Sequence, residues 1–256
     1  VGMVHRFEGW GFYEGPLFFV AAAIMLISTL PLFFLPEGGV GLSSSTAEET
    51  PHQQSRYSSS KIFVIFLAGM AFINFGRNSI AIIFSQYLTL DSGLALSSLT
   101  ISYIFNTHSA AIVILGWMAG WICLRLGNGF ALIIGTLAAV AGLSLLAVTT
   151  SLPLIYVASF MRGIGDGVIM AAAYTYASLL IPPLKRGRMF AWFNATFFLS
   201  FGLAGTLIAG PIVDGLIAAG RPQPIAYQVS FAAAAALTSI GLLIQAALII
   251  MLKKKD

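Results

Sequence analysis

The sequence predicts an all-α, polytopic membrane protein with seven transmembrane helices, and three observations support this fold class. Hydrophobic residues make up 58% of the 256 residues and charged residues only 9%, whereas soluble proteins average about 45–50% and about 25%. The apolar residues gather in seven runs, each of roughly the 20 residues that span a bilayer. Lipid offers no partner to an unpaired backbone amide, and the alternation of a barrel strand is absent, so these runs are expected to be helices.

The order of the runs divides the chain into three parts. An outer segment and a first transmembrane helix, at 16–35, occupy residues 1–35. Residues 36–60 are rich in Gly, Ser, Thr, Glu and Gln, a composition typical of a flexible linker. A six-helix transmembrane bundle is expected over 61–256, with its spans at 61–90, 98–124, 129–148, 153–181, 189–213 and 228–252.

Basic residues in the connections predict the orientation. Seven spans place the two ends on opposite sides, and the connections on one side contain only Arg6 and Arg221. Those on the other side contain Arg56, Lys61, Arg125, Lys185, Arg186, Arg188, Lys253, Lys254 and Lys255. Because basic residues gather on the cytoplasmic side, the linker and the C-terminus are expected there, in a prokaryotic plasma (inner) membrane. These residues lie between apolar spans and not on one amphipathic face, so the lipid bilayer and not a nucleic acid is the expected partner.

Charged residues inside the spans are the first candidates for function, because charges at membrane depth are costly. Arg77 lies about halfway along 61–90, and Asp166 about halfway along 153–181. We hypothesise that Arg77 binds an anionic substrate group or pairs with Asp166, and that Asp166 gains and loses a proton. Alternatively, Arg162 neutralises Asp166 locally, since the two are four residues apart on one helix face.

Uncharged polar residues in the spans are further candidates. Histidine side chains ordinarily titrate near neutral pH, so His108 could relay protons, or it could be a neutral residue of helix packing. Four asparagines could hydrogen-bond either the substrate or a neighbouring helix: Asn74, Asn78, Asn106 and Asn194. Small residues at close spacings, among them Gly116 with Gly120 and Gly202 with Gly205, favour close approach of helix backbones.

Enzyme signatures are weak. Gly163-Ile164-Gly165-Asp166 resembles the Gly-x-Gly-Asp of intramembrane aspartyl proteases, but Asp91 and Asp214, the other candidate carboxylates, fall at helix ends. Neither His-Glu-x-x-His nor a Walker phosphate loop occurs, and the single Cys123 excludes a Cys-rich metal site. We therefore expect no enzyme, metal or cofactor, with the protease as a remote alternative.

Three stretches resemble the later helices of major facilitator superfamily transporters. Leu180–Gly187, with its Pro-Pro and Arg-Gly, resembles the turn between the tenth and eleventh helices, and the Gly-rich helix after it ends Gly210-Pro211-Ile212-Val213-Asp214. Arg162-Gly163-Ile164-Gly165-Asp166-Gly167 resembles the tenth helix. The turn after the eighth helix reads Gly-x-x-x-Asp-Arg-x-Gly in the family, and this chain keeps Gly120, Arg125 and Gly127 but has Leu124 at the acidic position.

This resemblance covers residues 10–252, which correspond to the sixth helix and the six-helix C-terminal bundle. It implies a secondary active transporter that moves a small, possibly anionic, solute by alternating access, with protons as the expected coupling ion. The transport path of the family lies between two bundles, so missing N-terminal helices or a partner chain are implied. Gly210-Pro211 faintly resembles a motif of exporters, which favours export. The alternative is a non-transporting membrane scaffold or sensor subunit, which would lack a cavity around Arg77 and Asp166.

Overall fold

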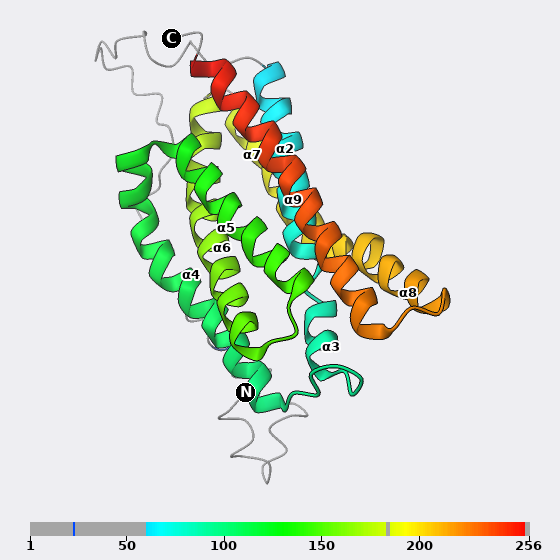
Figure 1. Cartoon of the computed structure of the whole chain (residues 1–256). Helices are drawn as coiled ribbons and strands as arrows, with labels where there is room; N and C mark the ends of the chain where they lie inside the picture. Colours follow the sequence, from blue (N-terminus) through cyan, green and yellow to red (C-terminus); the bar gives the residue numbers. More distant parts are fainter. Residues whose placement is uncertain (1–22, 24–59, 183–184, 254–256) are drawn as a thin grey trace, which may run out of the picture. The chain divides into compact units, whose positions relative to one another are not determined.

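The structure is a computed structural model that describes residues 23, 60–182 and 185–253 (Figure 1). Contacts divide the chain into two compact units, residues 1–51 and 52–256, and all of the helices below belong to the second unit. The predicted first span at 16–35 and the predicted linker at 36–60 lie outside the described residues, apart from residues 23 and 60.

Every regular element of the described part is a helix. In chain order these are α2 (Ser60–Ser79), α3 (Ile83–Thr89), α4 (Ser98–Leu126), α5 (Asn128–Val148), α6 (Leu152–Leu180), α7 (Arg186–Ala204), the π-helical turn η4 (Gly205–Ala209), α8 (Gly210–Ala218) and α9 (Gln223–Lys253). Six stretches are long and apolar enough to cross a membrane: α2 with α3, α4, α5, α6, α7 through α8, and α9. The predicted all-α membrane fold is therefore confirmed, with six of the seven predicted spans inside the described part.

Two of the spans are not continuous α-helices, which the sequence reading did not anticipate. The span predicted at 61–90 breaks after Ser79, whose hydroxyl donates to the carbonyl of Gly76 at 2.7 Å and so competes with the backbone. The span predicted at 189–213 extends over 186–218 and contains η4. Pro211 explains η4, because it cannot donate to the carbonyl four residues earlier and its ring clashes with that carbonyl.

The helices pack in a defined order. α6 lies against α4 and α5, while α9 lies against α2 and α5, and α7 packs on α2. Figure 1 shows α5 and α6 side by side, with α4 along one flank of the pair. At the α2–α9 contact a methyl group on Gly241 would lie 2.7 Å from the carbonyl oxygen of Gly69, so glycine permits this backbone approach.

A polar layer separates two apolar clusters in the bundle. On α2, Ile73 belongs to one cluster and Ile80 to the other, so that Asn74, Arg77 and Asn78 lie between them. On α6, Ala158 and Val168 belong to opposite clusters, with Arg162 and Asp166 between. The polar residues that the sequence singled out on α2 and α6 thus occupy one level of the fold.

Candidate functional site

Asp166 is the centre of the polar layer. It lies fourteen residues from each end of α6, and its two carboxylate oxygens have different partners. Oδ1 accepts a hydrogen bond from Arg77 Nη1 on α2 at 2.9 Å, and Oδ2 lies 3.0 Å from His108 Nε2 on α4. The side chain of Arg77 is 6% exposed, while those of His108 and Asp166 are 20% and 23% exposed. One carboxylate therefore joins three helices within the apolar bundle.

Glycines on α6 allow the neighbouring helices to come close enough to contact Asp166. A methyl group on Gly163 would collide with the carbonyl oxygen of His108, and one on Gly167 would lie 3.0 Å from the carbonyl oxygen of Ile112 on the same helix. Gly165 faces α5 instead, where a methyl group would lie 2.9 Å from the backbone nitrogen of Ala139. The alternating glycines thus let α4 and α5 pack against the backbone of α6 on either side of Asp166, which brings His108 within reach.

Arg162 is not the partner of Asp166, although the two lie four residues apart. Its guanidinium carbon lies 5.3 Å from the ring centroid of Phe84, a cation–π distance, and its aliphatic stem packs beside Gly142 of α5. Within the described part of the chain Arg162 has no ion pair inside 4.0 Å. The sequence left open whether Asp166 pairs with Arg77 or with Arg162, and in the structure its partner is Arg77. Because the layer holds two guanidinium groups and one carboxylate, it has an excess of positive charge when His108 is neutral.

Asn74 and Asn78 fasten α2 to α7 through matching hydrogen bonds. Asn74 Nδ2 donates to Thr196 Oγ1 at 3.2 Å, and Asn78 Nδ2 donates to Ser200 Oγ at 2.7 Å. Each hydroxyl gives its own proton to the backbone carbonyl three residues earlier. Since a hydroxyl has one proton, each can only accept from the asparagine, which assigns the amide orientation.

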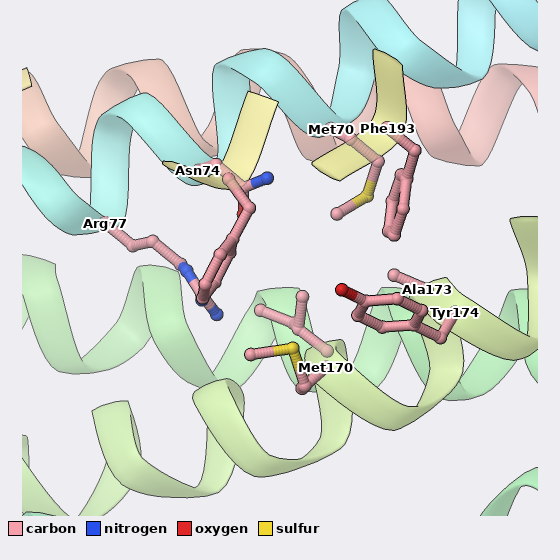
Figure 2. A pocket seen from close by; sticks show the side chains of 9 residues that line it. Met70, Asn74, Arg77, Met170, Ala173, Tyr174 and Phe193 are labelled. Carbon is pink, nitrogen blue, oxygen red and sulfur yellow. The ribbon is translucent and has the colours of Figure 1, made fainter. Parts of the chain in front are cut away.

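A narrow pocket of about 10 Å³, room for roughly one water molecule, opens beside Arg77 (Figure 2). Its lining comes from α2, α6 and α7: Met70, Asn74, Arg77, Ile169, Met170, Ala173, Tyr174, Phe193 and Phe197. Two polar atoms of this lining, Asn74 Oδ1 and Arg77 Nε, are buried without a hydrogen-bond partner among the described residues. The pocket therefore combines an apolar, partly aromatic wall with one acceptor and one donor that no described residue bonds.

The remaining predicted site residues lie apart from the ion pair. Asn194 Oδ1 accepts from the hydroxyl of Tyr174 at 2.6 Å and so holds a pocket residue in place. Asn106 is exposed on α4. At the turn between α4 and α5, Gly127 has φ 83°, a backbone conformation that favours glycine, and Arg125 stacks over Trp121 at 5.4 Å. A side chain at Gly120 would meet nothing within 4 Å in the described structure, nor would one at Gly202.

Sequence reasoning missed Thr196 and Ser200, although a signal was present. The hydroxyl residues on α7 are four apart, as are Asn74 and Asn78 on α2, so both pairs fall on one face of their helix. Met70, Met170 and Phe193 were also missed. They carry no polar group, and nothing in the sequence distinguishes them from other apolar residues of the spans.

Comparisons with known proteins agree with this architecture. The sequence profile of the Major Facilitator Superfamily matches residues 65–256. Among solved structures, a mutant of the peptide transporter POT in complex with sulfate superposes with a TM-score of 0.56 at 22% identity, over 73% of this chain and 37% of that chain. A search of curated proteins gives no match. At this identity the superposition supports the fold alone, whereas the profile covers most of the chain, and the chain therefore belongs to the major facilitator superfamily.

Proposed function

We propose that the complete protein is a secondary active transporter that moves a small anionic solute together with a proton by alternating access. The observation that carries this proposal is the position of Asp166 between Arg77 and His108, in the middle of a membrane-length helix. Ionisable groups at this depth mark ion and proton pathways in membrane proteins. The family is one of transporters and not of enzymes.

The ion pair gives a physical link between proton and substrate. While Asp166 is ionised, it neutralises Arg77, and an anion gains less at Arg77 than it would with Asp166 protonated, although Arg162 still leaves the layer with one excess positive charge. When Asp166 takes up a proton, directly or by way of His108, the guanidinium is left without a counter-charge in an apolar setting. An anionic group on the substrate would then restore neutrality. Proton and anion therefore favour each other's binding, so they would cross the membrane together.

Alternating access requires more helices than the described bundle contains. The chain spans 37% of the length of the solved transporter, and the transport path of such proteins lies at the interface between repeats. We propose that five further N-terminal helices, from the same chain or from a partner chain, complete the path. The linker and the C-terminus would face the cytoplasm, in keeping with the basic residues of Arg186, Arg188 and Lys253.

The direction of transport follows from the gradients across the membrane. Co-transport of a proton and an anion can run inward or outward, and the coupling at Asp166 works in both directions. Export, which Gly210-Pro211 favours faintly, stays a prediction. Release of an anion from loaded vesicles, compared with its uptake under the same inward proton gradient, would distinguish the two.

The test is transport by the complete protein in proteoliposomes under an imposed pH gradient. Asp166→Asn is expected to abolish gradient-driven accumulation while exchange of substrate across the membrane continues. Asp214→Asn is the matched control, since this carboxylate is exposed on α8 and far along the chain from the ion pair. Unchanged accumulation by Asp166→Asn would remove Asp166 as the coupling residue, and no transport by the wild type would favour the scaffold or sensor alternative.

A further inference from the structure

We propose that a groove between the beginnings of α2 and α7 binds an anionic phospholipid, with the lipid phosphate at a basic rim and an acyl chain along an apolar floor. This inference goes beyond the proposed function, because it requires only that the apolar helices of the bundle span a membrane. The groove has a volume of about 470 Å³, which lies within the roughly 300–1,000 Å³ of ligand pockets. It is therefore large enough for part of a lipid, unlike the pocket beside Arg77.

Two basic residues form the rim of the groove. Lys185 directly precedes α7 and Arg188 lies in its first turn, and both side chains are exposed. Neither forms an ion pair within 4.0 Å in the described part of the chain. The carboxylates of that part lie elsewhere: Asp166 is in the polar layer, while Asp91 and Asp214 lie near the far ends of the spans that begin with α2 and α7. The rim thus holds two cations that no described residue neutralises.

The floor of the groove is apolar. It is lined from both helices by Phe63, Val64, Leu67, Met189 and Trp192. Trp192 is four residues after Arg188 and so falls on the same side of α7, and its side chain is 57% exposed. Val64 on α2 is also 57% exposed. Because basic and apolar side chains share one groove, the ligand that fits it is amphipathic.

The depth of the groove matches the head group and upper acyl chain of a lipid. Lys61 and Arg186 begin their spans. At ~1.5 Å per residue, Leu67 and Trp192 each lie about 9 Å further along their helices. The rim is therefore expected at the level of the lipid phosphates, where tryptophan is also enriched nearby, and the floor in the hydrocarbon. Basic pockets between transmembrane helices bind anionic lipid head groups.

Other ligands fit only one part of the groove. A free inorganic anion would engage the cations but leave the exposed apolar floor without a partner. A zwitterionic lipid would cover the floor but bring a cationic group close to Lys185 and Arg188. The solute site is also a separate place, since Val64 lies ten residues before Asn74, about 15 Å along α2. An anionic phospholipid satisfies both the rim and the floor.

The test is photo-crosslinking of the complete protein in vesicles made of equal parts phosphatidylglycerol and phosphatidylcholine. Two probes carry the same photoreactive group near the start of one acyl chain and differ only in their head group, phosphatidylglycerol or phosphatidylcholine. Mass spectrometry measures the labelling of Val64, Leu67 and Trp192. Each basic residue near a lipid phosphate is worth about a fivefold change in affinity. We therefore expect the phosphatidylglycerol probe to label the groove about 25-fold more than the phosphatidylcholine probe.

Three variants assign the preference to the groove. Arg188→Gln should lower the preference for phosphatidylglycerol about fivefold. Arg186→Gln is the matched control, because Arg186 is exposed on the same turn of α7 but does not line the groove, and it should keep the preference. Val64→Trp fills the groove without changing its charge, so it should reduce the labelling of Leu67 and Trp192 by both probes. If a variant fails to fold, the comparison of the two probes on the wild type still decides.

Four results would overturn the inference. These are equal labelling by the two probes in the wild type, equal losses in Arg188→Gln and Arg186→Gln, and displacement of the phosphatidylglycerol probe by inorganic phosphate, which would indicate a site for a free anion. The fourth is an absence of label on the lining residues, which would indicate that another part of the complete protein covers the groove. The expected preference in a protein without proton-driven transport would support the lipid site and refute the proposed function.

Discussion

Gly163→Ala tests whether close packing of α4 on α6 holds the site together. The added methyl group would point at α4, where it would lie 2.7 Å from the Cβ of Ala111 and closer still to the carbonyl oxygen of His108. Ordinary contact begins near 3.4 Å, so α4 must retreat by about 0.7 Å or more. α4 is a regular helix of 29 residues, and therefore His108 would move with it.

The displacement is large enough to break one hydrogen bond of Asp166. His108 Nε2 now lies 3.0 Å from Asp166 Oδ2, and a retreat of about 0.7 Å would lengthen this distance to about 3.7 Å, beyond hydrogen-bonding range. The effect on stability is smaller. Overpacking costs about 1–3 kcal/mol, but alanine in place of glycine within a helix returns about 0.5–1 kcal/mol. The net loss of unfolding free energy is expected to be about 0–2.5 kcal/mol.

The assay combines thermal unfolding with nuclear magnetic resonance of ¹⁵N-labelled histidine side chains. Gly163→Ala is expected to change the His108 ring signals and to lower the melting temperature slightly. Gly215→Ala is the matched control, because a methyl group there would meet nothing within 4 Å, and it should leave the His108 signals unchanged. Unaltered His108 signals in Gly163→Ala, together with a raised melting temperature, would refute the packing argument.

Four further substitutions test the packing and the charges. Gly241→Ala should lower the unfolding free energy by about 0–2.5 kcal/mol in thermal denaturation, because the methyl group would press on the backbone of α2, a cost that the helix propensity of alanine partly offsets. Gln245→Leu should change it by less than about 1 kcal/mol: the bond from Nε2 to the Phe66 carbonyl is lost, but so is the unpaired Oε1. Asp166→Ala should cost about 3–5 kcal/mol, since it leaves a buried guanidinium without its partner. Arg162→Met should cost less in the same assay, because Arg162 has no ion pair among the described residues.

Composition and run length were sufficient to predict the helices and the positions of the charges along them. The spans at 129–148 and 153–181 agree with α5 and α6 to within a residue at each end, because the membrane imposes a minimum length on any apolar run that crosses it. Counting along those runs also placed Asp166 midway, where it lies on α6. Depth along a helix depends on rise per residue alone, so it needs no knowledge of packing.

The partner of Asp166 could not be predicted in the same way. Sequence spacing makes Arg162 the neighbour of Asp166 on the helix surface. The residue with which a long side chain pairs, however, also depends on the residues that pack around it. Gly142 opens room for the stem of Arg162 on α5, and Phe84 receives its guanidinium. Arg77, 89 residues away in sequence, reaches Asp166 instead. The rotation of α2 against α6 decides this pairing, and it follows from contacts along both helices.

The glycines with the closest contacts are not the ones that the sequence singled out. Gly120 and Gly202 have the spacing of packing residues but face open space in the described structure, whereas Gly163 and Gly165 lie against backbone or Cβ atoms of other helices. The spacing of glycines indicates that one face of a helix carries small residues. It does not indicate whether that face contacts another helix. Gly165 has no partner at four-residue spacing, and only its contact with α5 reveals its role.

The choice of Arg77 over Arg162 changes what a proton at Asp166 can do. A pair within α6 would neutralise two charges without linking α6 to another helix, so losing it would leave the packing of the bundle as it was. In this structure one oxygen of Asp166 is bonded to α2, and the other lies within hydrogen-bonding distance of a ring on α4. Removing the negative charge therefore weakens the attraction between three helices at one point. Under the proposed function, a proton on Asp166 would thereby loosen the contact between these helices.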